Sequence, residues 1–157
     1  MAISANGIIA RENNEEVFLS HDNWGTLVGL LSKTGCLIWG AKTYKLVRQW
    51  EEQYWGDVKS VQKIIVSNEN MELEEGCVLA NSPEDALEIA KAQGFNEVIL
   101  SGGGTLNASF AKSGLIDEVI FNVEPVVIGK GIPVFAKDDF EFFLEPQDIK
   151  KLSNGIL

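Results

Sequence analysis

The apolar residues of this chain fall into short continuous runs separated by longer stretches of helical spacing. Four runs, at 36–39, 62–67, 77–80 and 97–101, have the length and composition of strands. The run at 36–39 is apolar throughout, which is typical of a strand that a parallel sheet buries on both faces. Strands alternating with helices predict a three-layer α/β domain, with helices on both sides of the sheet.

Capping residues predict where two of the intervening helices begin and end. Ser20 is a good N-cap, and the helix after it is closed by Gly35, which suits the position just past a helix end. Ser82 and Pro83 form a second start signal, because proline is well tolerated at the first helical position. Gly94 ends that second helix.

Two further stretches complete the predicted fold. Residues 42–54 predict one helix, because their large side chains recur at helical spacing: Tyr44, Val47, Trp50 and Tyr54. Apolar residues alternate over 140–144, and 154–155 is Asn-Gly, the pair most typical of a two-residue hairpin turn. The sequence therefore predicts one domain over 1–157, with a mixed, mainly parallel sheet and an antiparallel C-terminal hairpin.

Three consecutive glycines, Gly102, Gly103 and Gly104, follow the strand at 97–101 and precede a helix that begins near Thr105. Glycine lets a ligand or another backbone approach closely, and the first N–H groups of a helix favour an anion such as a nucleotide phosphate. The loop matches neither Gly-x-Gly-x-x-Gly nor a P-loop. A phosphate site and a tight turn that needs small residues are both consistent with it.

Other short polar segments also follow predicted strands. Gly40 with Lys42 and Thr43 follows one strand, and Ser67 with Asn68 ends another. Because the carboxyl ends of parallel strands meet at one edge of a sheet, we expect these segments and the glycine loop to line one crevice. Glu124, at the end of a later apolar run, is expected at the same edge.

Composition and charge exclude several classes of partner. The net charge of -10 disfavours nucleic acid and membrane surfaces, whose phosphates would be repelled. No segment has the apolar length of a membrane helix, and one histidine with two distant cysteines gives no metal-ligand cluster. We therefore expect no metal, a small-molecule ligand and a cytoplasmic location.

Five segments together resemble a known family. They are 4–10, 40–44, 101–107, 114–118 and 124–135. They resemble the dihydrofolate reductase superfamily, and within it they are closest to the C-terminal reductase domain of riboflavin biosynthesis, of the bacterial RibD type. The resemblance implies a dihydrofolate reductase-like fold and hydride transfer from NADPH.

The resemblance also implies which residues contact the cofactor. The backbone of the glycine loop and the first helical turn would contact the diphosphate, and the start of the second helix would hold cofactor phosphate as well. Ser67 and Asn68 would lie near the adenosine 2′-phosphate. Asn68 stands where the family often has a basic residue, so NADH remains an alternative. The full set of implied cofactor contacts is Gly40, Lys42, Thr43, Ser67, Asn68, Gly102, Gly103, Gly104, Thr105 and Leu106.

Two carboxylates are the candidate catalytic residues. Asp22 resembles the acid that faces the substrate ring in this superfamily, where it would deliver a proton to nitrogen, although it suits a plain helix-start charge equally well. Glu124 would bind substrate or only accept hydrogen bonds before Pro125. Ser4 and Asn6, in the first turn, complete the predicted substrate site.

The preferred function is NADPH-dependent reduction of 5-amino-6-(5-phosphoribosylamino)uracil in riboflavin biosynthesis. Dihydrofolate reduction is the first alternative, and a nucleotide-binding protein without turnover is the second. The first and last strands look short for the family, as if the domain were clipped at both ends. A short last strand leaves an open sheet edge, and such edges invite pairing, so a homodimer is a further expectation.

Overall fold

The centre of the molecule is a four-stranded parallel sheet. The structure is a computed structural model that describes residues 1–50 and 52–152. The strands lie in the order β5-β4-β3-β6. Their bounds are Cys36–Gly40 for β3, Gln62–Val66 for β4, Cys77–Ala80 for β5 and Ile99–Leu100 for β6. Each of the first three occupies a predicted apolar run, and β6 is shorter than its run.

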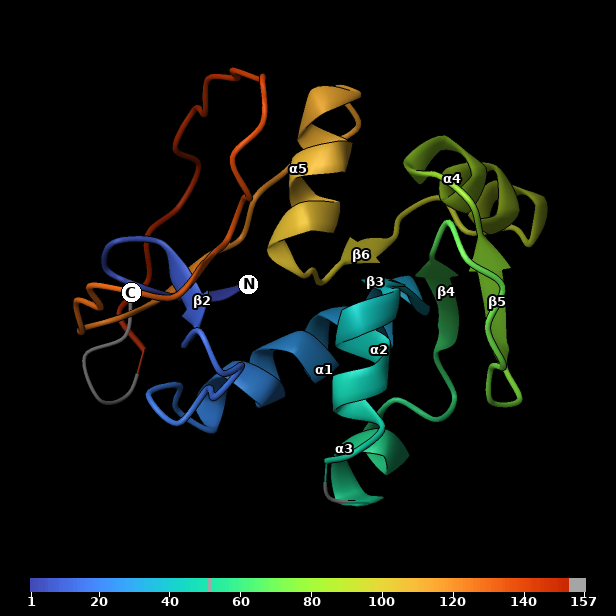
Figure 1. The fold of residues 1–157 in the computed structure, drawn as a ribbon, viewed down its shortest axis with the longest axis horizontal. Helices are drawn as coiled ribbons and strands as arrows, with labels where there is room; N and C mark the ends of the chain where they lie inside the picture. The colour runs from blue at the N-terminus through green and yellow to red at the C-terminus, as the bar shows by residue number, and fades with distance from the viewer. Residues whose placement is uncertain (51, 153–157) are drawn as a thin grey trace.

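Helices cover both faces of this sheet (Figure 1). Side chains of α1 and α2 share one buried cluster with Leu37 and Trp39 of β3, and Trp55 of α3 packs against it. Side chains of α4 and α5 share a second cluster with Cys36 and Ile38. Because neighbouring residues of β3 face opposite clusters, the three predicted layers are confirmed. The helices are α1 (Asp22–Thr34), α2 (Ala41–Val47), α3 (Glu52–Asp57), α4 (Pro83–Ala92) and α5 (Gly104–Lys112).

Two smaller strand pairs join the ends of the chain. β1 (Ala2–Ser4) runs parallel to β7 (Asn122–Glu124), and β2 (Ile8–Ala10) runs antiparallel to β8 (Ile132–Pro133). Gly131 is required beside the second pair, because a Cβ there would lie 2.5 Å from the carbonyl oxygen of Ala10. The predicted fold class, mainly parallel with a small antiparallel part, is confirmed.

The helix starts at Ser82 and Asp22 differ in how well they were predicted. Ser82 caps α4 through its hydroxyl oxygen, which accepts from the N–H of Asp85 at 3.1 Å. By contrast, α1 begins at Asp22, with His21 as its N-cap and no side-chain cap. The prediction of Ser20 as N-cap is wrong, because its hydroxyl accepts from the side-chain amide of Asn23 at 3.3 Å and not from a backbone N–H of the helix.

The one helix predicted over 42–54 is wrong, because the structure has two helices there, α2 and α3. The chain tightens at the end of α2, where the N–H groups of Gln49 and Trp50 each bond a carbonyl three residues back. This turn brings the rings of Trp50 and Tyr54 edge-on to Trp24 of α1, at 6.0 and 5.1 Å between centroids. Aromatic packing between helices therefore decides the break.

The strand predicted over 140–144 is also wrong, since residues 134–152 contain no helix or strand. The alternating phenylalanines instead form an aromatic cluster, in which the rings of Phe135, Phe140 and Phe142 lie 5.7 to 6.1 Å apart. The predicted turn at 154–155 lies outside the described residues. Among the helices that the structure describes, none is long and apolar enough to cross a membrane.

Candidate functional site

The two glycine turns that follow β3 and β6 meet, as the sequence predicts. The N–H of Gly40 donates to the carbonyl of Gly102 at 2.9 Å. A Cβ on Gly103 would lie 3.3 Å from Oγ1 of Thr43. The first turns of α2 and α5 are therefore adjacent, and the absence of a side chain at Gly103 allows this close approach.

The start of α5 offers unpaired backbone donors. Gly103 is its N-cap and supplies no side-chain cap, and the first helical bond runs from the N–H of Asn107 to the Gly103 carbonyl at 3.0 Å. The first N–H groups of any helix have no acceptor inside it. Within residues 1–50 and 52–152, those of Thr105 and Leu106 find no backbone acceptor outside α5 either. Such an end favours an anion locally, despite the negative net charge of the chain.

The three glycines of the loop have different roles. Gly102 has φ +83°, a left-handed conformation that favours glycine. Gly104 packs against the chain after β8, because a Cβ on it would lie only 2.2 Å from the carbonyl oxygen of Pro133. Gly103 is the glycine whose missing side chain faces the meeting point of the two helices, so it is the one best placed to admit a ligand.

The end of β4 lies one strand away from this meeting point, since Val66 pairs with Gly40 in the sheet. The Ser67 hydroxyl donates to the carbonyl of Glu69 at 3.0 Å and accepts from its N–H at 3.1 Å. Asn68 is exposed, as is Lys42 in the first turn of α2. The structure thus brings the predicted cofactor residues to one edge, and their contact with a cofactor stays a prediction.

A large cavity opens beside the paired helix starts. It has a volume of about 1280 Å³ and is lined by Thr43 and Gly103 together with Ser20 and Asn23 at the start of α1. Trp39 of β3 also lines it. A cavity of this size accommodates a nucleotide-sized ligand with a small substrate.

Glu124 lies next to this cavity and holds the start of α1. Its side chain is only 5% exposed, and Oε1 accepts from the N–H of Ser20 at 2.7 Å and from Nδ2 of Asn23 at 2.6 Å. The alternative in which Glu124 accepts hydrogen bonds within the chain is therefore observed. Its contact with substrate stays a prediction.

The predicted substrate residues Ser4 and Asn6 are engaged with neighbouring segments. Ser4 is fully buried opposite Glu124 in the β1–β7 pair, and its hydroxyl donates to Oδ1 of Asn6 at 2.8 Å. Nδ2 of Asn6 donates to the carbonyl of Ile128 at 2.8 Å, and Oδ1 accepts from the N–H of Ile128 at 3.1 Å. These bonds fix the first turn against the segment after β7. Binding of substrate by either residue stays a prediction.

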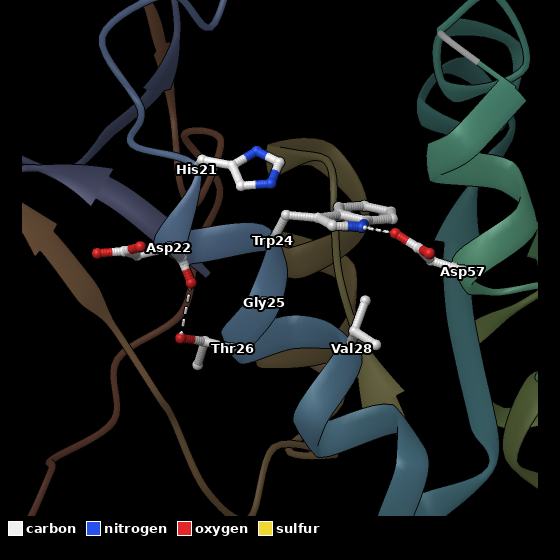
Figure 2. Close-up of a pocket in the computed structure, with 7 residues that line it drawn as sticks. All are labelled: His21, Asp22, Trp24, Gly25, Thr26, Val28 and Asp57. Atoms are coloured by element: carbon white, nitrogen blue, oxygen red, sulfur yellow. Dashed lines mark hydrogen bonds between the residues drawn. The ribbon is translucent and has the colours of Figure 1, made fainter.

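Asp22 lines a second, smaller pocket of about 580 Å³, which it shares with His21 and Trp24 (Figure 2). The indole Nε1 of Trp24 donates to Oδ2 of Asp57 at 2.8 Å, and the Asp22 carboxylate points away from this pair. Asp22 does not line the larger cavity among the residues described. Its role as proton donor stays a prediction, in competition with its role as a helix-start charge.

Glu16 is a candidate that the sequence did not reveal. It lies in the irregular segment before α1 and lines the large cavity; the residue is exposed to solvent, and desolvation by the neighbouring atoms raises the pKa of its carboxyl to about 7. A carboxyl that holds its proton near neutral pH can act as a general acid. The only sequence signal was an acidic residue in a polar stretch, and its position depends on how that stretch folds.

We expect the stability of the protein to fall as pH rises from about 4.5 to about 7 because of Glu16. In this range the folded state keeps the Glu16 proton, whereas the unfolded chain releases it, so ionisation favours unfolding. Glu16→Gln removes this contribution. Denaturant unfolding of both proteins from pH 4 to 8 should show the variant gaining stability relative to wild type over this window; a constant difference would contradict the assignment.

Comparisons with known proteins identify the family and agree with the fold. The family model described as RibD C-terminal domain matches residues 1–157. Uncharacterized protein YyaP of Bacillus subtilis (strain 168) is 24% identical over 168 residues, covering 100% of this chain and 89% of that protein.

Two solved structures are also similar. One, from Shewanella sp. PV-4 and named "Putative riboflavin biosynthesis protein", has a TM-score of 0.74 and 26% identity, covering 96% of this chain and 87% of that chain. The other comes from Thermotoga maritima and is named a diaminohydroxyphosphoribosylaminopyrimidine deaminase/5-amino-6-(5-phosphoribosylamino)uracil reductase. It shares the fold, with a TM-score of 0.64 and 16% identity. The match covers 87% of this chain and 47% of that chain. Because the family model matches residues 1–157, this chain belongs to the RibD C-terminal domain family.

Proposed function

We propose that this chain is a nicotinamide-dependent reductase that acts on 5-amino-6-(5-phosphoribosylamino)uracil. One observation carries the proposal: the first turns of α2 and α5 meet at Gly103 and open together into a cavity of about 1280 Å³. Membership of the RibD C-terminal domain family supports the reductase class, and the Thermotoga maritima protein of the same fold carries this reductase activity in its name.

The residues at the two helix starts suit a cofactor diphosphate. Thr105 and Leu106 present N–H groups without backbone acceptors in the described structure, and Gly103 and Thr43 both line the large cavity. Lys42 adds a nearby positive charge. At the end of β4, residues 67–70 read Ser-Asn-Glu-Asn, without a cation to attract a 2′-phosphate. The proposal is therefore NADPH or NADH, with the choice decided by assay.

The bound cofactor would supply the hydride, and the chain would supply position and a proton. Glu124, fixed by Ser20 and Asn23, would orient the substrate from its buried place beside the cavity. Asp22 remains the proposed proton donor to nitrogen. Glu16 is a second candidate for this step, because it lines the large cavity, which Asp22 does not, and desolvation raises the pKa of its carboxyl to about 7.

The direct test follows the absorbance of the reduced nicotinamide with purified protein. NADPH and NADH are each supplied with the ribosylaminopyrimidine phosphate or with dihydrofolate. Turnover of the pyrimidine alone supports the proposal. Turnover of dihydrofolate alone replaces it with the dihydrofolate alternative, and cofactor binding without turnover of either substrate favours the nucleotide-binding alternative.

Gly103→Ala is expected to weaken cofactor binding about ten-fold or more, equivalent to about 1.4 kcal/mol of binding free energy. The added methyl would occupy the space between the two helix starts, 3.3 Å from the Thr43 hydroxyl, which can rotate away. The fold should therefore survive. Calorimetric titration with NADPH measures the affinity, circular dichroism checks the fold, and an unchanged dissociation constant in a folded variant would remove the central claim.

A further inference from the structure

Three aromatic side chains gather at one end of the large cavity. Trp24 of α1, Trp50 just after α2 and Tyr54 of α3 all line it. Their rings meet edge to face in every pair, with centroids 6.0 Å apart for Trp24–Trp50, 5.1 Å for Trp24–Tyr54 and 5.7 Å for Trp50–Tyr54. We call these three residues the aromatic group. Because each ring also lines the cavity, part of its surface is open to a ligand.

The aromatic group is only partly buried. Trp50 is 38% exposed, and Trp24 and Tyr54 are half-buried. Rings that stay open to water would gain free energy by stacking against a flat ligand. Trp55 of α3 differs, because the guanidinium of Arg48 lies 4.5 Å from the centre of its ring and, among the residues described, Trp55 does not line the cavity.

Two polar groups of the aromatic group are available to a ligand. In the described part of the chain, the indole N–H of Trp50 and the hydroxyl of Tyr54 have no hydrogen-bond partner. By contrast, the indole N–H of Trp24 donates to Oδ2 of Asp57 at 2.8 Å, which fixes that ring (Figure 2). The hydroxyl of Tyr44, on the neighbouring helix, accepts a backbone N–H at 2.9 Å. The unused donors suit the amino and carbonyl groups at the edge of a heterocycle.

The charges at this end of the cavity favour a neutral ring over a phosphate. Among the described residues, Lys91 is the one lysine or arginine that lines the cavity, and it lies on α4, across the sheet from α1 and α2. The carboxylate of Asp57 contacts the aromatic group through Trp24. A phosphate placed here would therefore meet a negative charge and no cation.

The aromatic group and the proposed cofactor site lie at opposite ends of α2. Thr43 is in the first turn of this helix, whereas Trp50 follows its end. At the rise of an α-helix, the two residues are separated by roughly 10 Å along the axis. The same cavity thus joins a phosphate-binding end, at Gly103 and Thr43, to an aromatic end.

We propose that the aromatic group binds a flat nitrogen heterocycle by stacking, and that this ring is the pyrimidine of the substrate. This inference rests on the proposed function, whose substrate contains such a ring. The ring edge would bond the Tyr54 hydroxyl and the Trp50 indole N–H. The ribosyl phosphate would point away from Asp57, because that carboxylate would repel it.

The first test uses the wild-type chain and two fragments of the substrate, observed through the indole N–H signals in an NMR spectrum. 5,6-Diaminouracil is the base without its ribosyl phosphate, and ribose 5-phosphate is the other half. We expect 5,6-diaminouracil to shift the signals of Trp24 and Trp50 and to leave that of Trp55 in place. Ribose 5-phosphate is expected to leave Trp24 and Trp50 unchanged.

The second test compares variants by titration with 5,6-diaminouracil. Trp50→Ala is expected to bind it about ten-fold more weakly, as for the loss of one base–aromatic stack, and Trp50→Phe should keep most of the affinity. Phe143→Ala is the matched control, since Phe143 is 91% exposed and, in the structure described, lies outside the cavity lining. It should bind the base as the wild type does, and circular dichroism checks that each variant is folded.

Three results would overturn the proposal. They are no shift of Trp24 and Trp50 with millimolar 5,6-diaminouracil, the same shifts with ribose 5-phosphate, and equal affinity of Trp50→Ala and wild type for the base. Weaker binding of NADPH by Trp50→Ala, with binding of the base unchanged, would assign the ring to the nicotinamide and overturn it as well. A protein that binds the base through Trp50 but reduces neither candidate substrate contradicts the proposed function and not the ring-binding site.

Discussion

Replacing Gly104 by alanine is expected to destabilise the protein by about 3 kcal/mol, at the upper end of the usual cost of overpacking. A Cβ at this position would lie 2.2 Å from the carbonyl oxygen of Pro133, a distance that only a backbone shift can relieve. The N–H of Ala136 also donates to the Gly104 carbonyl at 2.9 Å, and the side-chain amide of Asn107 donates to the Val134 carbonyl at 2.7 Å. A shift would therefore strain two hydrogen bonds between α5 and the chain around β8.

The measurement is urea unfolding, with Gly25→Ala as the matched control. Gly25 lies in α1 with no atom within 4 Å of its added Cβ and no positive φ. Alanine there is expected to stabilise the helix by about 0.5–1 kcal/mol, because it restricts the unfolded chain more than glycine does. If Gly104→Ala unfolds at the same urea concentration as Gly25→Ala, the close approach between α5 and Pro133 is wrong.

Replacing Glu124 by alanine is expected to cost about 3 kcal/mol of stability and to abolish turnover. Two donors, the N–H of Ser20 and the side-chain amide of Asn23, would lose a buried charged acceptor, and hydrogen bonds to charged groups contribute about 1.5–3 kcal/mol each. Because these bonds hold the start of α1 beside the cavity, their loss should displace that wall of the proposed site.

Glu124→Gln separates charge from geometry, since the amide oxygen can still accept both bonds. We expect a smaller loss of stability than for alanine, and a turnover that reports whether the negative charge is needed. Glu118→Ala, on the exposed segment before β7, is the control and should stay within about 0.5 kcal/mol of wild type. Unfolding curves and initial rates measure these effects; equal stability of Glu124→Ala and Glu118→Ala would contradict the role assigned to Glu124.

The parallel sheet was predictable because its signals are local. The run at 36–39 is apolar on both faces, and β3 is indeed buried on both. Ser82 followed by Pro83 gave the start of α4 correctly. The break between α2 and α3 was not predictable from spacing, because Trp50 and Tyr54 continue the helical period while their rings pack on a different helix.

Some features of the candidate site could also be predicted from the sequence, and others could not. That Gly40 and Gly102 lie at one sheet edge followed from the parallel direction of the strands, whereas their direct contact depends on β3 and β6 being neighbours, which no local pattern gives. The hydrogen bonds of Glu124 could not be predicted, because they join residues that are 104 and 101 positions apart in the sequence. The raised pKa of Glu16 depends on how an irregular segment folds beside the cavity, which no local pattern encodes.

The pairing of the terminal strands sets an order of events during folding. β3, β4, β5 and β6 pair in parallel with partners that are all present once residue 100 has been made. β1 cannot pair until Asn122 has been made, and β2 cannot pair until Ile132 has been made. Each of these contacts closes most of the chain into a loop. Such long closures are slow. During synthesis, β1 and β2 therefore emerge long before their partners and are the last strands to pair.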